Sequence, residues 1–167
     1  MGCAASIRVG AATPFVIDAG PTQRKTHVFL GGACNPTTWR QQIAMPRFDA
    51  AGVVYYNPQV AEWHDGLIQL ENDAKNTADT LLFVINDETR GVMSMTEATY
   101  YIGKGRQVVL VLADYTGDTV DVAKDINRGR AFIADVVNNE DHMKHLKMFA
   151  TIDAAVEHLC DLHGSRG

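Results

Sequence analysis

The sequence predicts a doubly wound α/β fold, in which a parallel sheet of about five strands carries helices on both faces. Short apolar, β-rich runs alternate along the chain with longer segments of helical character, which is typical of parallel strands joined by helices. Two runs, Thr80–Ile85 and Val108–Leu112, are almost continuously apolar, as expected of strands covered on both faces. Right-handed crossovers between such units favour a flavodoxin-like arrangement.

The elements are expected in strict alternation from residue 27 onward. The expected strands are residues 28–30, 53–56, 80–85, 107–112 and a less apolar segment at 147–150. The expected helices are residues 38–51, 67–78, 95–104, 120–137 and 152–163. Pro46 should kink or split the first helix, because proline lacks the amide donor and clashes with the preceding turn.

The N-terminal part of the chain is less regular. Its apolar runs, residues 7–9 and 15–17, are interrupted by glycine and proline and fit either an edge strand or hairpin or a simple tether. We therefore divide the chain into an N-terminal segment, residues 1–25, and an α/β domain, residues 26–164.

Composition excludes several classes of protein. With 167 residues, of which 46% are hydrophobic, the chain suits one domain with a real core. Fifteen basic against twenty acidic residues, without a basic cluster, argue against binding to nucleic acid. No apolar run reaches the length of a membrane-spanning helix. Cys3, Cys34 and Cys160 have neither disulfide-framework nor metal-ligand spacing, so we expect a cytoplasmic protein without a metal or cofactor.

The first six residues fit the pattern for N-myristoylation, in which Gly2 is followed four residues later by Ser6. One myristoyl chain binds a bilayer only marginally, and Cys3 offers a palmitoylation site beside it. In a eukaryotic cell we expect acylation and peripheral contact with a membrane. The alternative is an unmodified terminus of small residues.

Small and polar residues follow each expected strand. Because the carboxyl ends of parallel strands meet at one edge of the sheet, these residues are candidates for binding a ligand there. They are Gly31, Gly32, Asn35, Asn57 and Asn86. No dinucleotide fingerprint or P-loop accompanies the glycine pair, which by itself favours a tight turn.

Glu97 lies near the start of an expected helix, and two interpretations are open. Ser94 and Glu97 have the S-x-x-E spacing of a capping box, which is a structural role. Alternatively, Glu97 is a carboxylate held at a helix N-terminus facing the ligand edge. The helix dipole there favours the ionised form that a nucleophile needs.

Two further candidates lie in and before the second helix. Asp73 is at the edge of that helix's apolar stripe, where most carboxylates are simply solvated. Trp63, followed by His64, offers an aromatic platform for a flat ligand and a titratable group, although such pairs often anchor loops.

These residues belong to a stretch, 27–112, that resembles the nucleoside 2-deoxyribosyltransferase-like family. The similar motifs are the first strand turn (residues 28–33), Asn72-Asp73, Ala78-Asp79 and the Glu-x-x-Tyr-x-x-Gly-Lys segment at residues 97–104. The segments 29–40 and 56–59 look like a less characterised, eukaryotic-type branch of that family.

The resemblance implies chemistry at an N-glycosidic bond. It assigns Glu97 as the nucleophile that forms a covalent glycosyl-enzyme, and Asp73 as the residue that handles the departing base. Tyr100, or its neighbour Tyr101, would hold the glutamate in position. The implied partner is a small nucleoside or nucleotide, and the implied assembly is a homo-oligomer, because family members commonly complete the site across a subunit interface.

One departure from the family pattern keeps other functions open. Classical transferases carry a second acid six positions before the nucleophile, where this chain has Gly91 beside Arg90. Arg90 would instead suit a phosphate. The alternatives are a non-catalytic nucleotide-binding or signalling scaffold of the same fold and an NAD glycohydrolase.

Overall fold

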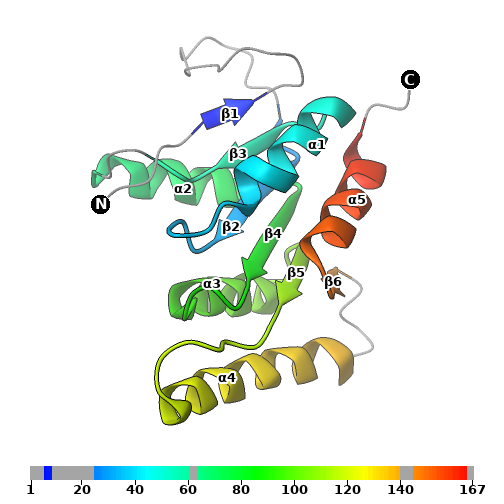
Figure 1. Ribbon diagram of the computed structural model, residues 1–167. Helices are drawn as coiled ribbons and strands as arrows, with labels where there is room; N and C mark the ends of the chain where they lie inside the picture. Colours follow the sequence, from blue (N-terminus) through cyan, green and yellow to red (C-terminus); the bar gives the residue numbers. More distant parts are fainter. Residues whose placement is uncertain (1–5, 9–24, 61–63, 140–144, 165–167) are drawn as a thin grey trace.

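The computed structural model of the protein describes residues 6–8, 25–60, 64–139 and 145–164. Its centre is a six-stranded sheet in the order β1-β3-β2-β4-β5-β6 (Figure 1). The strands are β1 (Ser6–Arg8), β2 (Val28–Gly32), β3 (Tyr55–Asn57), β4 (Thr80–Ile85), β5 (Val108–Leu112) and β6 (Leu146–Phe149). Strands β2 to β6 are parallel, and this confirms the predicted doubly wound α/β fold.

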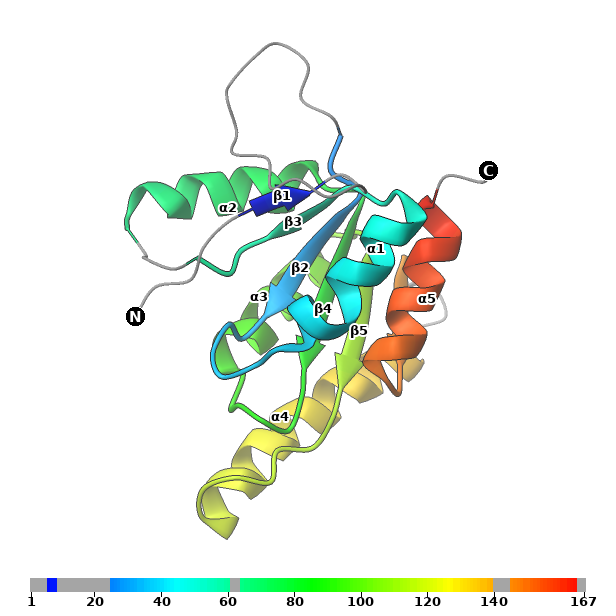
Figure 2. The same cartoon turned by 45° about the horizontal axis from the view of Figure 1, so that its top comes forward.

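Strand β1 pairs antiparallel with β3 at the edge of the sheet, as Figure 2 shows. Ile7 lies opposite Tyr56 in this pair. The edge-strand interpretation of the first apolar run is therefore confirmed, and the strand comes from the segment assigned above to residues 1–25.

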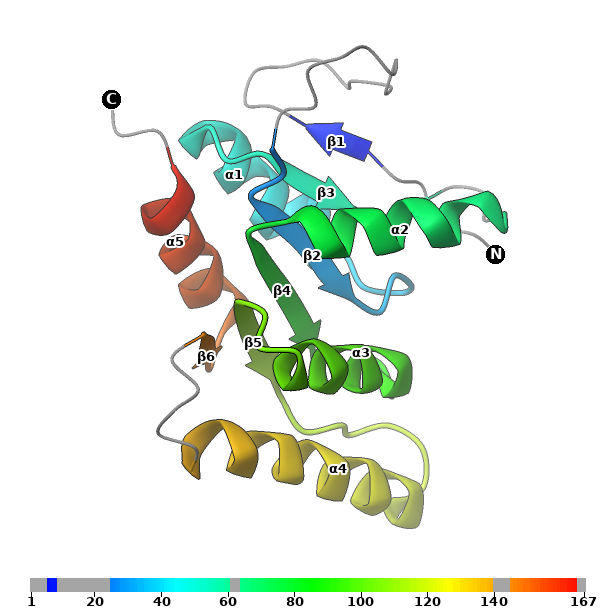
Figure 3. The ribbon, with the colours of Figure 1, turned by 180° about the vertical axis from the view of Figure 1, so that it is seen from behind.

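Helices cover both faces of the sheet. They are the π-helix η1 (Arg40–Ala44), α1 (Met45–Ala51), α2 (Gly66–Thr77), α3 (Val92–Gly103), α4 (Val120–Asn139) and α5 (Ile152–His163). Helices α2, α3 and α4 lie on the face turned toward the viewer in Figure 3, and η1, α1 and α5 lie on the other. Pro46 stands in the first turn of α1, directly after η1, so the expected helix at 38–51 changes from π to α geometry there while its backbone stays helical.

The side chains of the strands contribute alternately to two hydrophobic cores, because successive residues of a strand point to opposite faces of the sheet. Along β2, Val28 and Leu30 belong to the core under α1 and α5, whereas Phe29 belongs to the core under α2 and α3. All six residues of β4 are buried. The nearly continuous apolar sequence of the central strands follows from this two-sided burial.

The chain order places the carboxyl ends of the parallel strands at one edge of the sheet. Strand β2 has β3 on one side and β4 on the other, so the chain reverses its direction of progress across the sheet at β2. Ligands of doubly wound domains bind beyond the strand ends at such a reversal.

Candidate active site

A buried lysine joins two glutamates where α2 and α3 lie over the sheet. Lys75 Nζ of α2 is 2.5 Å from Glu97 Oε1 of α3 and 3.6 Å from Glu71 Oε2, one turn earlier in α2. The lysine side chain is 6% exposed, and the side chains of Glu71 and Glu97 are 24% and 28% exposed. We call these three residues the Glu–Lys–Glu cluster. Its carboxylates are sheltered but open to a ligand.

Two aromatic rings of the sheet lie next to this cluster. Lys75 Nζ is 5.3 Å from the centre of the Phe29 ring, which stacks on Tyr56 at 5.5 Å. Burial, and then the charge of Glu71, raises the pKa of Tyr56 to about 12. The Tyr56 hydroxyl is buried and has no hydrogen-bond partner among the described residues. A neutral phenol with an unused donor therefore faces the acidic side of the cluster.

Glu71 is the carboxyl group of the cluster that resists ionisation. Burial, and after it the negative charge of Glu97, raises its pKa, while Lys75 and Arg40 act in the opposite direction. A raised pKa is the direction that a proton-donating carboxyl group requires. The arrangement suits a pair in which one carboxylate attacks and the other gives up a proton.

Glu97 does not act as a helix cap, so the capping-box interpretation is wrong. Helix α3 begins at Val92, three residues earlier than expected, because Gly91 at its N-cap adopts a left-handed conformation with φ of 61°. Ser94 is consequently buried inside the first turn, and the carboxylate of Glu97 pairs with Lys75.

Asp73 lies apart from this pair. Its side chain is exposed on α2, where Oδ1 accepts a hydrogen bond of 2.8 Å from Gln69 Nε2. Glu71 and Lys75, which lie two residues to either side of Asp73, pair with each other, and Lys75 also pairs with Glu97. Their i,i+4 spacing is the signal in the sequence that identifies them as one face of the helix.

The glycine pair at the end of β2 allows close packing against β4. A Cβ atom on Gly31 would lie 2.6 Å from Cδ1 of Phe83. Gly32 has φ of 124°, and a Cβ there would lie 2.4 Å from the carbonyl oxygen of Val84. Both positions therefore demand glycine for packing within the sheet, rather than for the tight turn expected from the sequence.

A fully buried arginine fixes the loop after β2. Arg40 donates hydrogen bonds to the carbonyl oxygens of Leu30, Gly32 and Ala33 at 3.1, 2.8 and 2.9 Å. Asn35, at a cis peptide bond to Pro36, is exposed in the same loop.

The loop after β3 is tied to this first loop. Asn57 is buried, and its Oδ1 accepts a hydrogen bond from the backbone of Gln59 at 3.0 Å. The Gln59 side chain in turn donates to the carbonyl oxygens of Cys34 and Thr37 at 2.5 and 3.3 Å. Asn57 therefore shapes the loops at the ligand edge.

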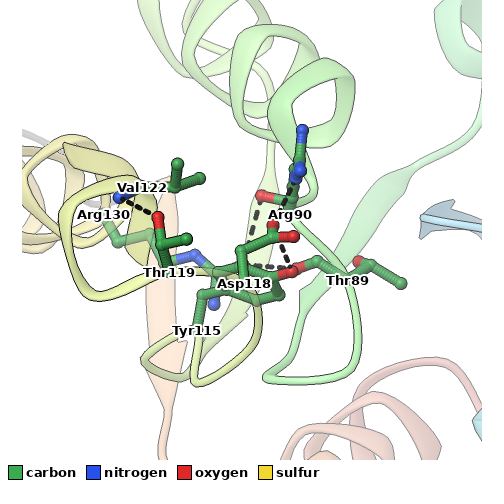
Figure 4. Close-up of polar contacts among 7 residues, drawn as sticks. All are labelled: Thr89, Arg90, Tyr115, Asp118, Thr119, Val122 and Arg130. Atoms are coloured by element: carbon green, nitrogen blue, oxygen red, sulfur yellow. Dashed lines mark hydrogen bonds and ion pairs between the residues drawn. The ribbon is translucent and has the colours of Figure 1, made fainter. Parts of the chain in front are cut away.

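Another buried arginine holds the loops after β4 and β5 together (Figure 4). Arg130 of α4 donates to the carbonyl oxygens of Asn86, Thr89, Arg90 and Ala113. The side chain of Asn86 donates to Glu88 at 2.5 Å.

Arg90, the candidate phosphate contact, is engaged by an acid. Its Nε donates to Asp118 Oδ2 at 2.5 Å, and the hydroxyl of Tyr115 donates to the same oxygen at 2.7 Å (Figure 4). These two donors lower the pKa of Asp118 to about 2. A phosphate at Arg90 would have to displace this carboxylate.

The remaining candidates lie elsewhere or outside the described residues. Tyr100 is 55% exposed and accepts a hydrogen bond of 2.9 Å from Lys104, whereas Tyr101 packs against Phe83 in the core. Neither tyrosine hydrogen-bonds Glu97. Trp63, Gly2 and Cys3 fall outside the described residues. Within the described ranges no group of three metal-ligating side chains occurs, and no helix there is long and apolar enough to cross a membrane.

The fold and the site together define a flavodoxin-like α/β domain with an acidic cluster near the reversal of strand order, an arrangement suited to a small-molecule ligand. Residues 25–115, more than half of the chain, match the family model described as nucleoside 2-deoxyribosyltransferase like, and the chain belongs to that family. The match spans β2 to β5 and includes the whole Glu–Lys–Glu cluster. A search of curated proteins finds no match.

Proposed function

We propose that the protein cleaves the N-glycosidic bond of a nucleoside, with Glu97 as the nucleophile. The observation that carries this proposal is the position of Glu97, whose sheltered carboxylate pairs with Lys75 beside Glu71, next to the Phe29 ring of β2. Family membership associates the chain with transferase activity on nucleosides. A carboxylate nucleophile suits this reaction because the transition state resembles an oxocarbenium ion.

In the proposed step, a carboxylate oxygen of Glu97 bonds to the anomeric carbon of the sugar. The bond between that carbon and the base nitrogen breaks, and its electron pair leaves with the base. A neighbouring carboxylic acid protonates the base as it departs. A second base, or water, then takes the sugar from Glu97 and regenerates the carboxylate.

Two carboxyl groups are candidates for the acid. The family resemblance implies Asp73, whose side chain is exposed and bound to Gln69. The contacts of the cluster favour Glu71, because it shares Lys75 with Glu97 and its pKa is raised.

Nucleosides are favoured over nucleotides as substrates. The cation that would suit a phosphate, Arg90, is paired with Asp118, and Asp118 is strongly acidic. The Glu–Lys–Glu cluster has two carboxyl groups and one ammonium, so it offers a phosphate no net positive charge.

The test is a chromatographic assay of base release from a panel of deoxynucleosides, ribonucleosides, nucleotides and NAD. The parent protein should release base from at least one nucleoside, and Glu97→Ala should abolish the release. Glu157→Ala, which removes an exposed glutamate on α5, is the matched control and should keep the parent rate. Protein denatured during turnover should carry the mass of one sugar on Glu97.

A nucleotide-binding scaffold of the same fold is the second candidate. It is favoured by Gly91, which stands where classical transferases have a second acid and here serves as the N-cap of α3. Binding of a nucleotide by calorimetry, without base release from any member of the panel, would support the scaffold and overturn the enzyme. Release from NAD alone would identify a glycohydrolase.

A further inference from the structure

Lys75 is unusual among the lysines of the described chain because its side chain is buried. Its ammonium contacts carboxylates from two helices, Glu97 at 2.5 Å and Glu71 at 3.6 Å, and lies 5.3 Å from the ring of Phe29. A buried ammonium loses its hydration and is costly without partners. Because both partners are the glutamates of the proposed site, the lysine is placed to influence their charges.

We propose that Lys75 is a positioning residue that balances a single negative charge as this charge moves from Glu97 to Glu71 during cleavage of the glycosidic bond. This inference rests on the function proposed above, and it goes beyond that function by assigning a role to a residue of α2 that touches neither base nor sugar.

Counting charges through the proposed step explains why one ammonium suffices. In the proposed step Glu97 attacks as a carboxylate, Glu71 donates a proton and Lys75 is positive, so the cluster starts neutral. As Glu97 bonds to the sugar, its charge is lost to the new ester, while Glu71 gives its proton to the departing base and becomes negative. Lys75 keeps its own proton throughout and transfers its ion pair from one glutamate to the other.

The geometry favours this exchange. The shorter contact, 2.5 Å, is to the group that must be ionised at the start, and the longer contact, 3.6 Å, is to the group that becomes ionised. Glu71 and Lys75 are one helical turn apart, so the second contact can shorten by side-chain rotation alone. Burial raises the pKa of Glu71 and the charge of Glu97 acts in the same direction, which is the direction that a proton donor requires.

The experiment compares the pH dependence of kcat/KM for base release in three variants. Lys75→Met removes the charge at similar volume, Lys75→Arg keeps it, and Lys124→Met removes an exposed lysine of α4 as the matched control. Circular dichroism and thermal melting identify any variant that fails to fold.

Lys75→Met should lower kcat/KM by about 100-fold or more, because the charge forming on Glu71 loses its stabilising partner. The alkaline limb of the profile, where Glu71 loses its proton, should move up by about one pH unit or more, since removing the ammonium raises the pKa of Glu71 further. Lys75→Arg should keep the alkaline limb at the pH of the parent, and Lys124→Met should match the parent throughout.

A purely structural ion pair would lower activity or stability without moving the alkaline limb. If folded Lys75→Met releases base with an alkaline limb unchanged from the parent, the inference about Lys75 is wrong while the proposed function stands. If the parent releases no base from any nucleoside, the proposed function is wrong and the role of Lys75 falls with it.

Discussion

Lys75 Nζ lies 2.5 Å from Glu97 Oε1 and thereby joins two helices that stand on either side of β4 in the chain. Because of this contact, the carboxylate of Glu97 lies against Lys75 of α2 and does not cap its own helix. Lys75 also contacts Glu71, whereas Asp73 binds Gln69, so the second acid of the cluster is Glu71.

The two acids can therefore be separated by mutation. Glu71→Gln should slow base release by about 100-fold or more, because the amide cannot protonate the departing base. Asp73→Asn should stay within a few-fold of the parent, since its side chain is exposed and contacts Gln69. The measurement is kcat for a nucleoside with a poor leaving group. The opposite ranking of the two variants would restore Asp73 as the acid.

Gly31→Ala should destabilise the fold by about 1–3 kcal/mol, the usual cost of overpacking. Its Cβ would lie 2.6 Å from the ring of Phe83 and 3.1 Å from the carbonyl oxygen of Leu82, which limits relaxation. Gly103→Ala is the control, because no atom lies within 4 Å of its Cβ position. Urea denaturation should find it neutral or slightly stabilised, and equal stability of the two variants would refute the packing argument.

Arg130→Met should cost at least about 3 kcal/mol, because it removes the donors from several buried carbonyl oxygens at once. Arg128→Met, an exposed change two residues away on α4, should stay within about 0.5 kcal/mol of the parent. The measurement is the free energy of unfolding of both variants by chemical denaturation. If Arg130→Met has the same free energy of unfolding as the parent, water satisfies these carbonyl oxygens as well as the guanidinium does.

His163 predicts a loss of stability in acid. Burial, and then the charge of His27 stacked on it at 5.5 Å, lowers the pKa of His163 in the folded protein. The unfolded chain takes up the proton at the ordinary pKa of about 6.5, so stability is complete above that pH and falls below it. The melting temperature of the parent should drop between pH 7 and pH 5, and that of His163→Gln should drop less. Parallel curves would exclude His163 as the cause.

The order of elements could be predicted from the sequence because the central strands are buried on both faces. Thr80–Ile85 and Ile152–His163 occupy the predicted residues, and Pro46 lies where the first helix changes from π to α geometry. The start of α3 could not be predicted, since it depends on the left-handed conformation of Gly91 rather than on the Ser94–Glu97 spacing.

The site was less accessible to sequence reasoning. Glu97 could be identified from its place near the start of a helix that follows a strand and from the family resemblance. Its ion-pair partner, Lys75, could not be, because this contact depends on how α2 and α3 pack on the sheet. Lys75 occupies a buried position that a hydrophobic pattern would assign to an apolar residue. Only the tertiary structure reveals that two carboxylates compensate its charge.

The two buried arginines, Arg40 and Arg130, have a consequence for how this protein can acquire a new preference. Their guanidinium groups bind carbonyl oxygens in and after β2 and β4, and so fix the course of the loops that follow these strands. In the proposed reaction, the side chains of α2 and α3 that form the Glu–Lys–Glu cluster would then act above a fixed frame. If the proposed reaction is correct, exchanging residues of these helices is the way to redirect it toward another base or sugar, while the arginine-held loops stay as they are.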